Sequence, residues 1–168
     1  MSYDLSSFAR TVAPHGARYL ILPAGKDLPA FSDGAAAVFH PDAPKMHSYR
    51  SVTARDAHKP SDLRPGKPTH RVTRAAVMKL PTLAYDRNGI EKRTFVRVGD
   101  AVVDTALLRR VMGPADDASV RVVLRGPRRG IVLRGNGWRA TVMPLDPDNA
   151  TSGGRAICAG RLRLSEIA

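Results

Sequence analysis

Residues 94–146 read TFVRVGDAVVDTALLRRVMGPADDASVRVVLRGPRRGIVLRGNGWRATVMPLD. This stretch predicts a strand, a short helix and then three strands. Asp104 is placed to cap the helix, apolar residues at helical spacing follow over 107–112, and Gly113 precedes a proline that ends it. Turns rich in glycine separate the apolar runs that follow. The stretch therefore predicts one β-α-β-β-β unit.

The first forty residues predict the same order of elements. A short strand is expected over residues 3–5, and Ser6 is placed to cap a helix that carries Phe8 and Val12 on one face. Three further strands are expected over 17–22, 28–31 and 35–39. Two similar units, 1–40 and 94–146, thus flank the middle of the chain.

The middle of the chain differs in composition from both units. Residues 41–70 are rich in proline, lysine and arginine, which predicts a basic loop or insertion with one strand over 48–53. Residues 71–93 predict a helix capped by Thr73, followed by a hairpin with its turn at 86–89. The middle therefore adds one helix to those of the two units.

The end of the chain, residues 147–168, is predicted to be a C-terminal extension. It begins as a loop, has an edge strand expected over 156–164, and is expected to fray over 165–168. Taken together, the elements predict a single α+β domain over residues 1–168, with an antiparallel sheet and two or three short helices on one face. The length of 168 residues suits one such domain.

The charge of the chain is its strongest compositional signal. Lysine and arginine number 27 against 15 acidic residues, which leaves a formal charge of +12. Such an excess costs self-repulsion, and it is typical of proteins with a polyanionic partner, either nucleic acid or an anionic membrane surface. A basic protein that is merely soluble is the alternative interpretation.

The single cysteine, Cys158, excludes an intrachain disulfide, and we expect its thiol to be buried and inert. The N-terminal sequence lacks the pattern of a secretion signal, and no apolar run is long enough for a membrane helix. We therefore expect a soluble, cytoplasmic protein that does not interact with membranes.

No catalytic motif is present, and no cofactor or metal is expected. The histidines lie in predicted loops without the ligand spacing of a zinc site; they are His15, His40, His47, His58 and His70. The glycines over 126–137 lack the strand-to-helix context and the Lys-Ser/Thr ending of a phosphate loop. The sequence therefore predicts a protein that is not an enzyme.

The basic residues are the candidate site. Five lie on or beside the three predicted helices: Arg10, Arg74, Lys79, Arg109 and Arg110. Five more crowd the following sheet segment, of which we select Arg125, Arg128 and Arg129 for the site, beside Arg134 and Arg139. Helices side by side on one face would form a cationic surface for phosphates. Since few exposed aromatics are expected, duplex DNA is preferred over single strands. A solvated helix face is the alternative.

A second candidate site is the apolar end of the last predicted strand, formed by Val142, Met143, Pro144 and Leu145. The proline forces the chain out of the strand ladder, which leaves Met143 and Leu145 at a sheet margin. Exposed methionine and leucine side chains suit an adaptable groove for a peptide. Simple core packing is the alternative for these four residues.

Residues 102–111, VVDTALLRRV, and 120–145, VRVVLRGPRRGIVLRGNGWRATVMPL, resemble the C-terminal end of the bacterial DNA sliding clamp, the beta subunit of DNA polymerase III. The resemblance covers about fifty residues and, in element order only, the first half. It implies two clamp-like units whose helices face DNA, with Arg10, Arg109 and Arg110 as contacts. It also implies that residues 142–145 contribute to a groove for partner peptides.

A bacterial clamp protomer has three such domains, whereas this chain has room for one. A ring would therefore need many copies, and the resemblance is equally consistent with a divergent module of a phage or mobile element. Our expectation is a homo-oligomeric accessory protein of DNA replication or repair that binds duplex DNA without sequence preference. The alternatives are a structural or assembly protein, for example of a virion, and a small RNA-associated protein.

Overall fold

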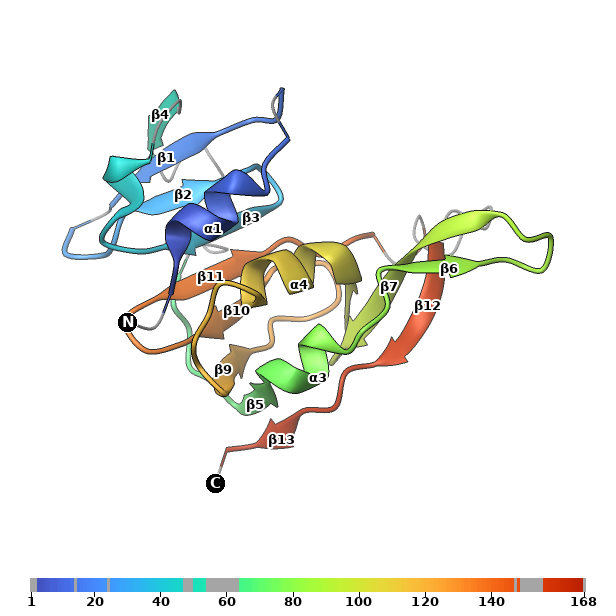
Figure 1. The fold of residues 1–168 in the computed structure, drawn as a ribbon. Coiled ribbons are helices and arrows are strands. Elements are labelled where there is room, and N and C mark those ends of the chain that lie inside the picture. The colour runs from blue at the N-terminus through green and yellow to red at the C-terminus, as the bar shows by residue number, and fades with distance from the viewer. Residues whose placement is uncertain are drawn as a thin grey trace.

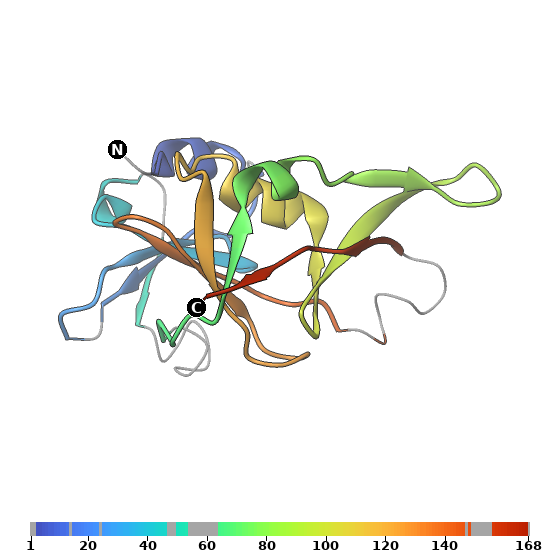
Figure 2. The ribbon, with the colours of Figure 1, turned by 90° about the horizontal axis from the view of Figure 1, so that it is seen from below.

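The computed structural model describes residues 3–13, 15–23, 25–46, 50–53, 64–146, 148 and 156–167, with side chains outside 50–53. Short helices lie on one side of a large sheet, and a hairpin extends from one end (Figures 1 and 2). The helices are α1 (Leu5–Arg10), α3 (Arg74–Met78) and α4 (Thr105–Met112), with a 3-10 turn η1 (Ala43–Lys45). The predicted α+β class, an antiparallel sheet with helices on one face, is confirmed.

The large sheet has nine strands in the order β13-β5-β9-β10-β11-β3-β2-β1-β4. Their bounds are β1 (Tyr19–Leu22), β2 (Ala30–Ser32), β3 (Ala36–Phe39), β4 (Arg50–Thr53), β5 (His70–Thr73), β9 (Ser119–Val123), β10 (Ile131–Arg134), β11 (Arg139–Val142) and β13 (Ser165–Glu166). Every neighbouring pair is antiparallel except β1 and β4.

A smaller sheet continues from one end of the molecule. It contains β6 (Leu83–Tyr85), β7 (Glu91–Val98), β8 (Ala101–Asp104) and β12 (Ala156–Arg161). The central strand β7 pairs with β6 and β8 in antiparallel fashion and with β12 in parallel. The β6–β7 hairpin extends away from the helices (Figure 1).

The two predicted units meet at their last strands. The first runs from Tyr3 through α1, β1, β2 and β3, and the second runs from β8 through α4, β9, β10 and β11. Strands β3 and β11 pair antiparallel, with Phe39 opposite Arg139 and Ala36 opposite Val142. Outward from this pair the order is β2-β1 on one side and β10-β9 on the other. The strand order of the first unit and that of the second unit are therefore related by an approximate twofold symmetry about the β3–β11 pair.

The main core fills the space between the helices and the large sheet. Phe8 of α1 and Leu108 and Met112 of α4 are fully buried against sheet residues such as Val38 and Leu133. Each such side chain contributes roughly 1.5–3 kcal/mol through its removal from water. The apolar spacing of α4, read from the sequence, therefore marks the face that packs on the sheet.

Local signals in the sequence located several elements correctly. The side chain of Thr73 accepts from the backbone N–H of Ala76 and caps α3, as predicted. Asp104 caps α4 in the same way by accepting from Leu107 N–H. The hairpin turn at 86–89 is also confirmed, because β6 and β7 pair on either side of it.

Other expectations near the start of the chain were wrong. Only Tyr3 of the expected strand over 3–5 forms a bridge, with Ala115, and Leu5 already begins α1. The cap of this helix is Asp4, not Ser6, because the Asp4 carboxylate accepts from Ser7 N–H at 3.2 Å. Residues 48 and 49 of the strand expected over 48–53 lie outside the described residues, and β4 covers the remainder.

Two of the last described residues of the C-terminal extension form a strand that was not expected, and Ala168 lies outside the described residues. Residues 165–168 were expected to fray, yet Ser165 and Glu166 form β13 and pair with Arg71 and His70 at the edge of the large sheet. The expectation of a buried Cys158 was also wrong, because this thiol is exposed on the edge strand β12. Both differences depend on pairing with strands that are distant in the sequence, β13 with β5 and β12 with β7.

Candidate nucleic-acid interface

The three helices lie along the same side of the large sheet (Figure 2). Their sequences, LSSFAR, RAAVM and TALLRRVM, contain no acidic residue. These helices and their caps carry the predicted cations Arg10, Arg74, Lys79, Arg109 and Arg110. Arg10 and Lys79 are exposed, whereas the other three are half-buried.

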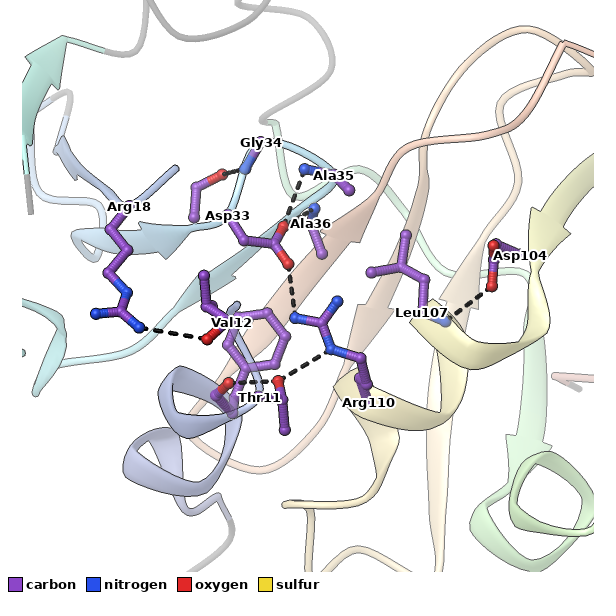
Figure 3. A network of polar contacts seen from close by, with 12 residues as sticks. Thr11, Val12, Arg18, Asp33, Gly34, Ala35, Ala36, Asp104, Leu107 and Arg110 are labelled. Atoms are coloured by element: carbon purple, nitrogen blue, oxygen red, sulfur yellow. Dashed lines mark hydrogen bonds and ion pairs between the residues drawn. The ribbon is translucent and has the colours of Figure 1, made fainter. Parts of the chain in front are cut away.

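Arg110 joins α4 to the first unit (Figure 3). Its Nε donates to Thr11 Oγ1 at 2.9 Å, and an Nη donates to Asp33 Oδ2 at 2.8 Å. The guanidinium also lies 5.5 Å from the centre of the Phe8 ring. Asp33 is itself held, because its other oxygen accepts from the backbone N–H of Ala35 at 2.9 Å. Arg110 thus has a structural role, and 31% of its side chain stays exposed for a further contact.

Two other arginines connect α3 and α4. Arg74 donates to the carbonyl of Gly113 at the end of α4, at 2.9 Å, and Arg109 donates to the carbonyl of Leu80 just after α3, at 3.1 Å. Helix ends leave carbonyls without intrahelical partners, and a cation stabilises them. Arg74 therefore satisfies a carbonyl at the end of α4, Arg109 joins α4 to the segment after α3, and both side chains still carry full charges on the helix side.

The remaining predicted cations lie elsewhere. Arg125, Arg128 and Arg129 belong to the β9–β10 connection, which lies on the side of the sheet away from the helices (Figure 2). Arg128 forms ion pairs of 3.3 Å with Asp146 and Asp148, and Arg125 donates to the carbonyl of Arg64. The structure therefore does not bring these three arginines together with the helix cations.

The predicted docking residues lie at the junction of the two sheets. Val142 is fully buried, whereas Met143, Pro144 and Leu145 are half-buried. The backbone N–H of Leu145 donates to the Val102 carbonyl at 2.7 Å, and its side chain packs on Phe95 and Val102. Leu145 therefore contributes to a small apolar cluster.

Arg71 and Arg121 were not among the predicted site residues, although both carry a recognisable signal. In β5 and β9 each arginine is exposed, whereas the neighbouring Val72 of β5 and Val120 of β9 are buried. That alternation places the arginines on the sheet face opposite to the helices. Pairing then puts Arg71 directly opposite Arg121, and Arg121 opposite Arg134.

Trp138 is unsuited to stacking on a nucleic-acid base. It is 3% exposed, and its Nε1 donates to Asp117 at 2.8 Å. Tyr85 is 70% exposed on the β6–β7 hairpin, and Tyr49 lies outside the described residues. Base stacking therefore has little support on the helix side.

Within the described ranges, no three His, Cys, Asp or Glu side chains are grouped as metal ligands would be. Likewise, no helix in the part of the chain that the structure describes is long and apolar enough to cross a membrane. In comparisons with known proteins, no family model, curated protein or solved structure matches the chain.

Proposed function

We propose that this protein binds the phosphate backbone of duplex DNA without sequence preference, through the side of the molecule that carries α1, α3 and α4. The observation that carries the proposal is that three helices without acidic residues lie on one side and present five cations there. Contacts to phosphates need only charge and N–H donors, which arginine and lysine supply. The resemblance to the sliding clamp supports the same face.

The proposed role is that of a non-catalytic, cytoplasmic accessory in DNA replication or repair. One clamp-like domain cannot surround a duplex, so the role implies several copies of the chain. Residues 142–145 are the proposed contact for a replication or repair protein, since Met143 to Leu145 are half-buried at a junction of two sheets. Both statements extend the DNA-binding proposal and depend on it.

The test is the affinity of the full chain for a labelled duplex of arbitrary sequence, measured at rising salt. Replacing the exposed cations Arg10 and Lys79 by glutamine should weaken binding to every sequence equally. Each replacement should reduce the salt slope by about one unit, because each cation displaces about one counterion. Arg87→Gln is the matched control, since Arg87 is exposed at the tip of the distant β6–β7 hairpin.

Absence of duplex binding at low ionic strength would overturn the proposal. So would an equal loss of affinity in the Arg87 control. Light scattering of the free protein separates the structural alternative, because a large defined assembly that forms without DNA supports a role in packing between subunits. Competition between RNA and DNA separates the RNA-associated alternative.

A further inference from the structure

We infer a second anion site, on the sheet face opposite to the helices, that binds a compact ligand with two or more adjacent phosphate groups. Arg71, Arg121 and Arg134 are its phosphate-binding residues. The inference rests on strand register and cavity geometry, and it does not depend on DNA binding by the helix side.

The register of the large sheet places four arginines in one line. Arg71, Arg121 and Arg134 are direct cross-strand partners on β5, β9 and β10, and Arg139 on β11 continues the same line. We call these four residues the arginine row. Since neighbouring strands lie about 4.8 Å apart, the part from Arg71 to Arg134 spans about 10 Å.

This arrangement carries an electrostatic cost. Like charges directly opposite each other on a sheet destabilise it. Arg139 is neutralised by Asp27, with two contacts of 2.6 Å, and Arg134 donates to the Gly66 carbonyl at 3.2 Å. Among the described residues, the guanidinium groups of Arg71 and Arg121 have no hydrogen-bond or ion-pair partner. A bound anion would relieve the repulsion that the fold itself leaves in place.

A cavity of about 450 Å³ lies at the arginine row. Four arginines and one aspartate line it, together with the β10–β11 turn at 135–137. The aspartate, Asp117, accepts from Asn136 N–H at 3.0 Å and from Trp138 Nε1 at 2.8 Å. Both of its oxygens thus hold the turn in place, and the arginines dominate the charge of the cavity. The volume is within the usual range for small-molecule sites.

The shape of the turn helps to form this cavity. A side chain on Gly135 would collide with the Trp138 indole, so only glycine allows the close approach of the turn to the ring. The indole is thereby held edge-on to Asp117 and buried. The cavity wall is therefore rigid and polar.

The surrounding charge favours the same kind of ligand. Residues 64–67 cross this face, because Gly66 approaches Val123 so closely that a side chain there would collide with it. Arg64 and Lys67 in this segment are exposed. They add two cations beside the arginine row.

Phosphate groups fit the site better than a base does. One guanidinium group can donate two parallel hydrogen bonds to the oxygens of one phosphate, and three guanidinium groups in line can hold adjacent phosphates. The buried Trp138 offers no ring face on which a base could stack. A row of about 10 Å suits a triphosphate better than a long strand, which would need a continuous groove. The ligand is therefore a free polyphosphate or the triphosphate of a nucleotide.

The experiment is calorimetric titration of the full chain with tripolyphosphate, at low salt. Separate titrations with a nucleoside triphosphate and with a single-stranded oligonucleotide distinguish the sources of the phosphates. Arg121→Gln, at the centre of the row, should weaken tripolyphosphate binding about tenfold, as expected for loss of a charge-assisted contact. Arg87→Gln is the matched control and should leave the affinity unchanged.

The unfolding temperature, measured with and without tripolyphosphate, distinguishes loss of the binding site from misfolding of the variant. Without ligand, Arg121→Gln should unfold at the same temperature as the parent chain or higher, because one repulsive pair on each side of Arg121 disappears. With tripolyphosphate, the parent should gain more thermal stability than the variant. A merely structural arginine would give the opposite result in the ligand-free protein.

Three outcomes overturn the inference: no binding of tripolyphosphate, equal affinity of the parent and Arg121→Gln, or tighter binding of the oligonucleotide than of either compact phosphate. Replacement of Arg10 and Lys79 by glutamine should leave tripolyphosphate affinity intact. A failure here is therefore distinguishable from a failure of DNA binding by the helix side.

Discussion

Replacement of Asp27 by asparagine should destabilise the protein by about 3 kcal/mol, because it leaves a buried guanidinium without its carboxylate. The Arg139 side chain is 8% exposed, and two of its nitrogens each lie 2.6 Å from an Asp27 oxygen. The same guanidinium lies 3.8 Å from the centre of the Phe39 ring. An arginine held in this way cannot turn outward to water without loss of its ring contact.

The magnitude follows from the burial of the two partners. Loss of one partner from a fully buried pair costs about 3–5 kcal/mol. Asp27 retains 32% of its side-chain exposure, so solvent screens part of the interaction and the lower end of that range applies. For a chain of this length, such a loss lowers the unfolding temperature by roughly 6–12 °C.

Urea unfolding, monitored by circular dichroism, measures this loss of stability. The urea concentration at the midpoint should be lower in the variant, and the dependence of the unfolding free energy on urea concentration should be unchanged. The control is Asp42→Asn, whose partner Lys45 is 77% exposed. Loss of that surface pair should cost no more than about 0.5 kcal/mol. A double variant, Asp27→Asn with Arg139→Met, should recover most of the lost stability, because the buried charge is gone.

Two results would refute this reasoning. One is an Asp27→Asn variant as stable as the Asp42→Asn control, and the other is a double variant that is less stable than either single one. In both cases the guanidinium would have found another partner or reached water.

Acid titration should show the same pair. The Arg139 hydrogen bonds hold the pKa of the Asp27 carboxyl below its usual value of 3.8. The ion pair therefore stabilises the fold in full above pH 3.8 and loses its effect as the pH falls through the lowered pKa. The stability of Asp27→Asn should consequently fall less steeply with acid than that of the parent chain. Gly135→Ala should displace the Trp138 indole and cost about 1–3 kcal/mol, visible as altered tryptophan fluorescence and a lower urea midpoint, whereas Gly89→Ala, with open space around its Cβ position, should leave the fluorescence unchanged. Cys158 should react fully with a thiol reagent in the folded protein, and slow reaction limited by unfolding would contradict its exposure.

Local features of the fold could be read from the sequence because short-range contacts specify them. The caps at Thr73 and Asp104 each act on an N–H three residues further on, and the turn at 86–89 closes between adjacent strands. The α+β class followed from the same kind of signal. The cap of α1 was predicted wrongly at Ser6 because Ser6 and Asp4 are both residue types that cap helices, and only the backbone path after Tyr3 distinguishes them.

The candidate site depended on information that the sequence by itself does not contain. The helix cations could be listed, but the bonds from Arg110 to Thr11 and Asp33 connect residues 99 and 77 positions apart. The arginine row depends even more on tertiary structure, because Arg71 and Arg121 become neighbours only through the register of β5 and β9. Alternation along one strand predicts which face a side chain takes but not which side chains stand beside it.

The sequence alone thus determined the α+β class, the caps of α3 and α4, the turn at 86–89 and the excess of positive charge. Tertiary structure decided the pairing of β3 with β11, the ordering of Ser165 and Glu166 on β5, and the division of the cations between two faces. The physical reason is range: caps and turns are satisfied within a few residues, whereas strand pairing joins distant segments whose partners are selected by the burial of the whole sheet.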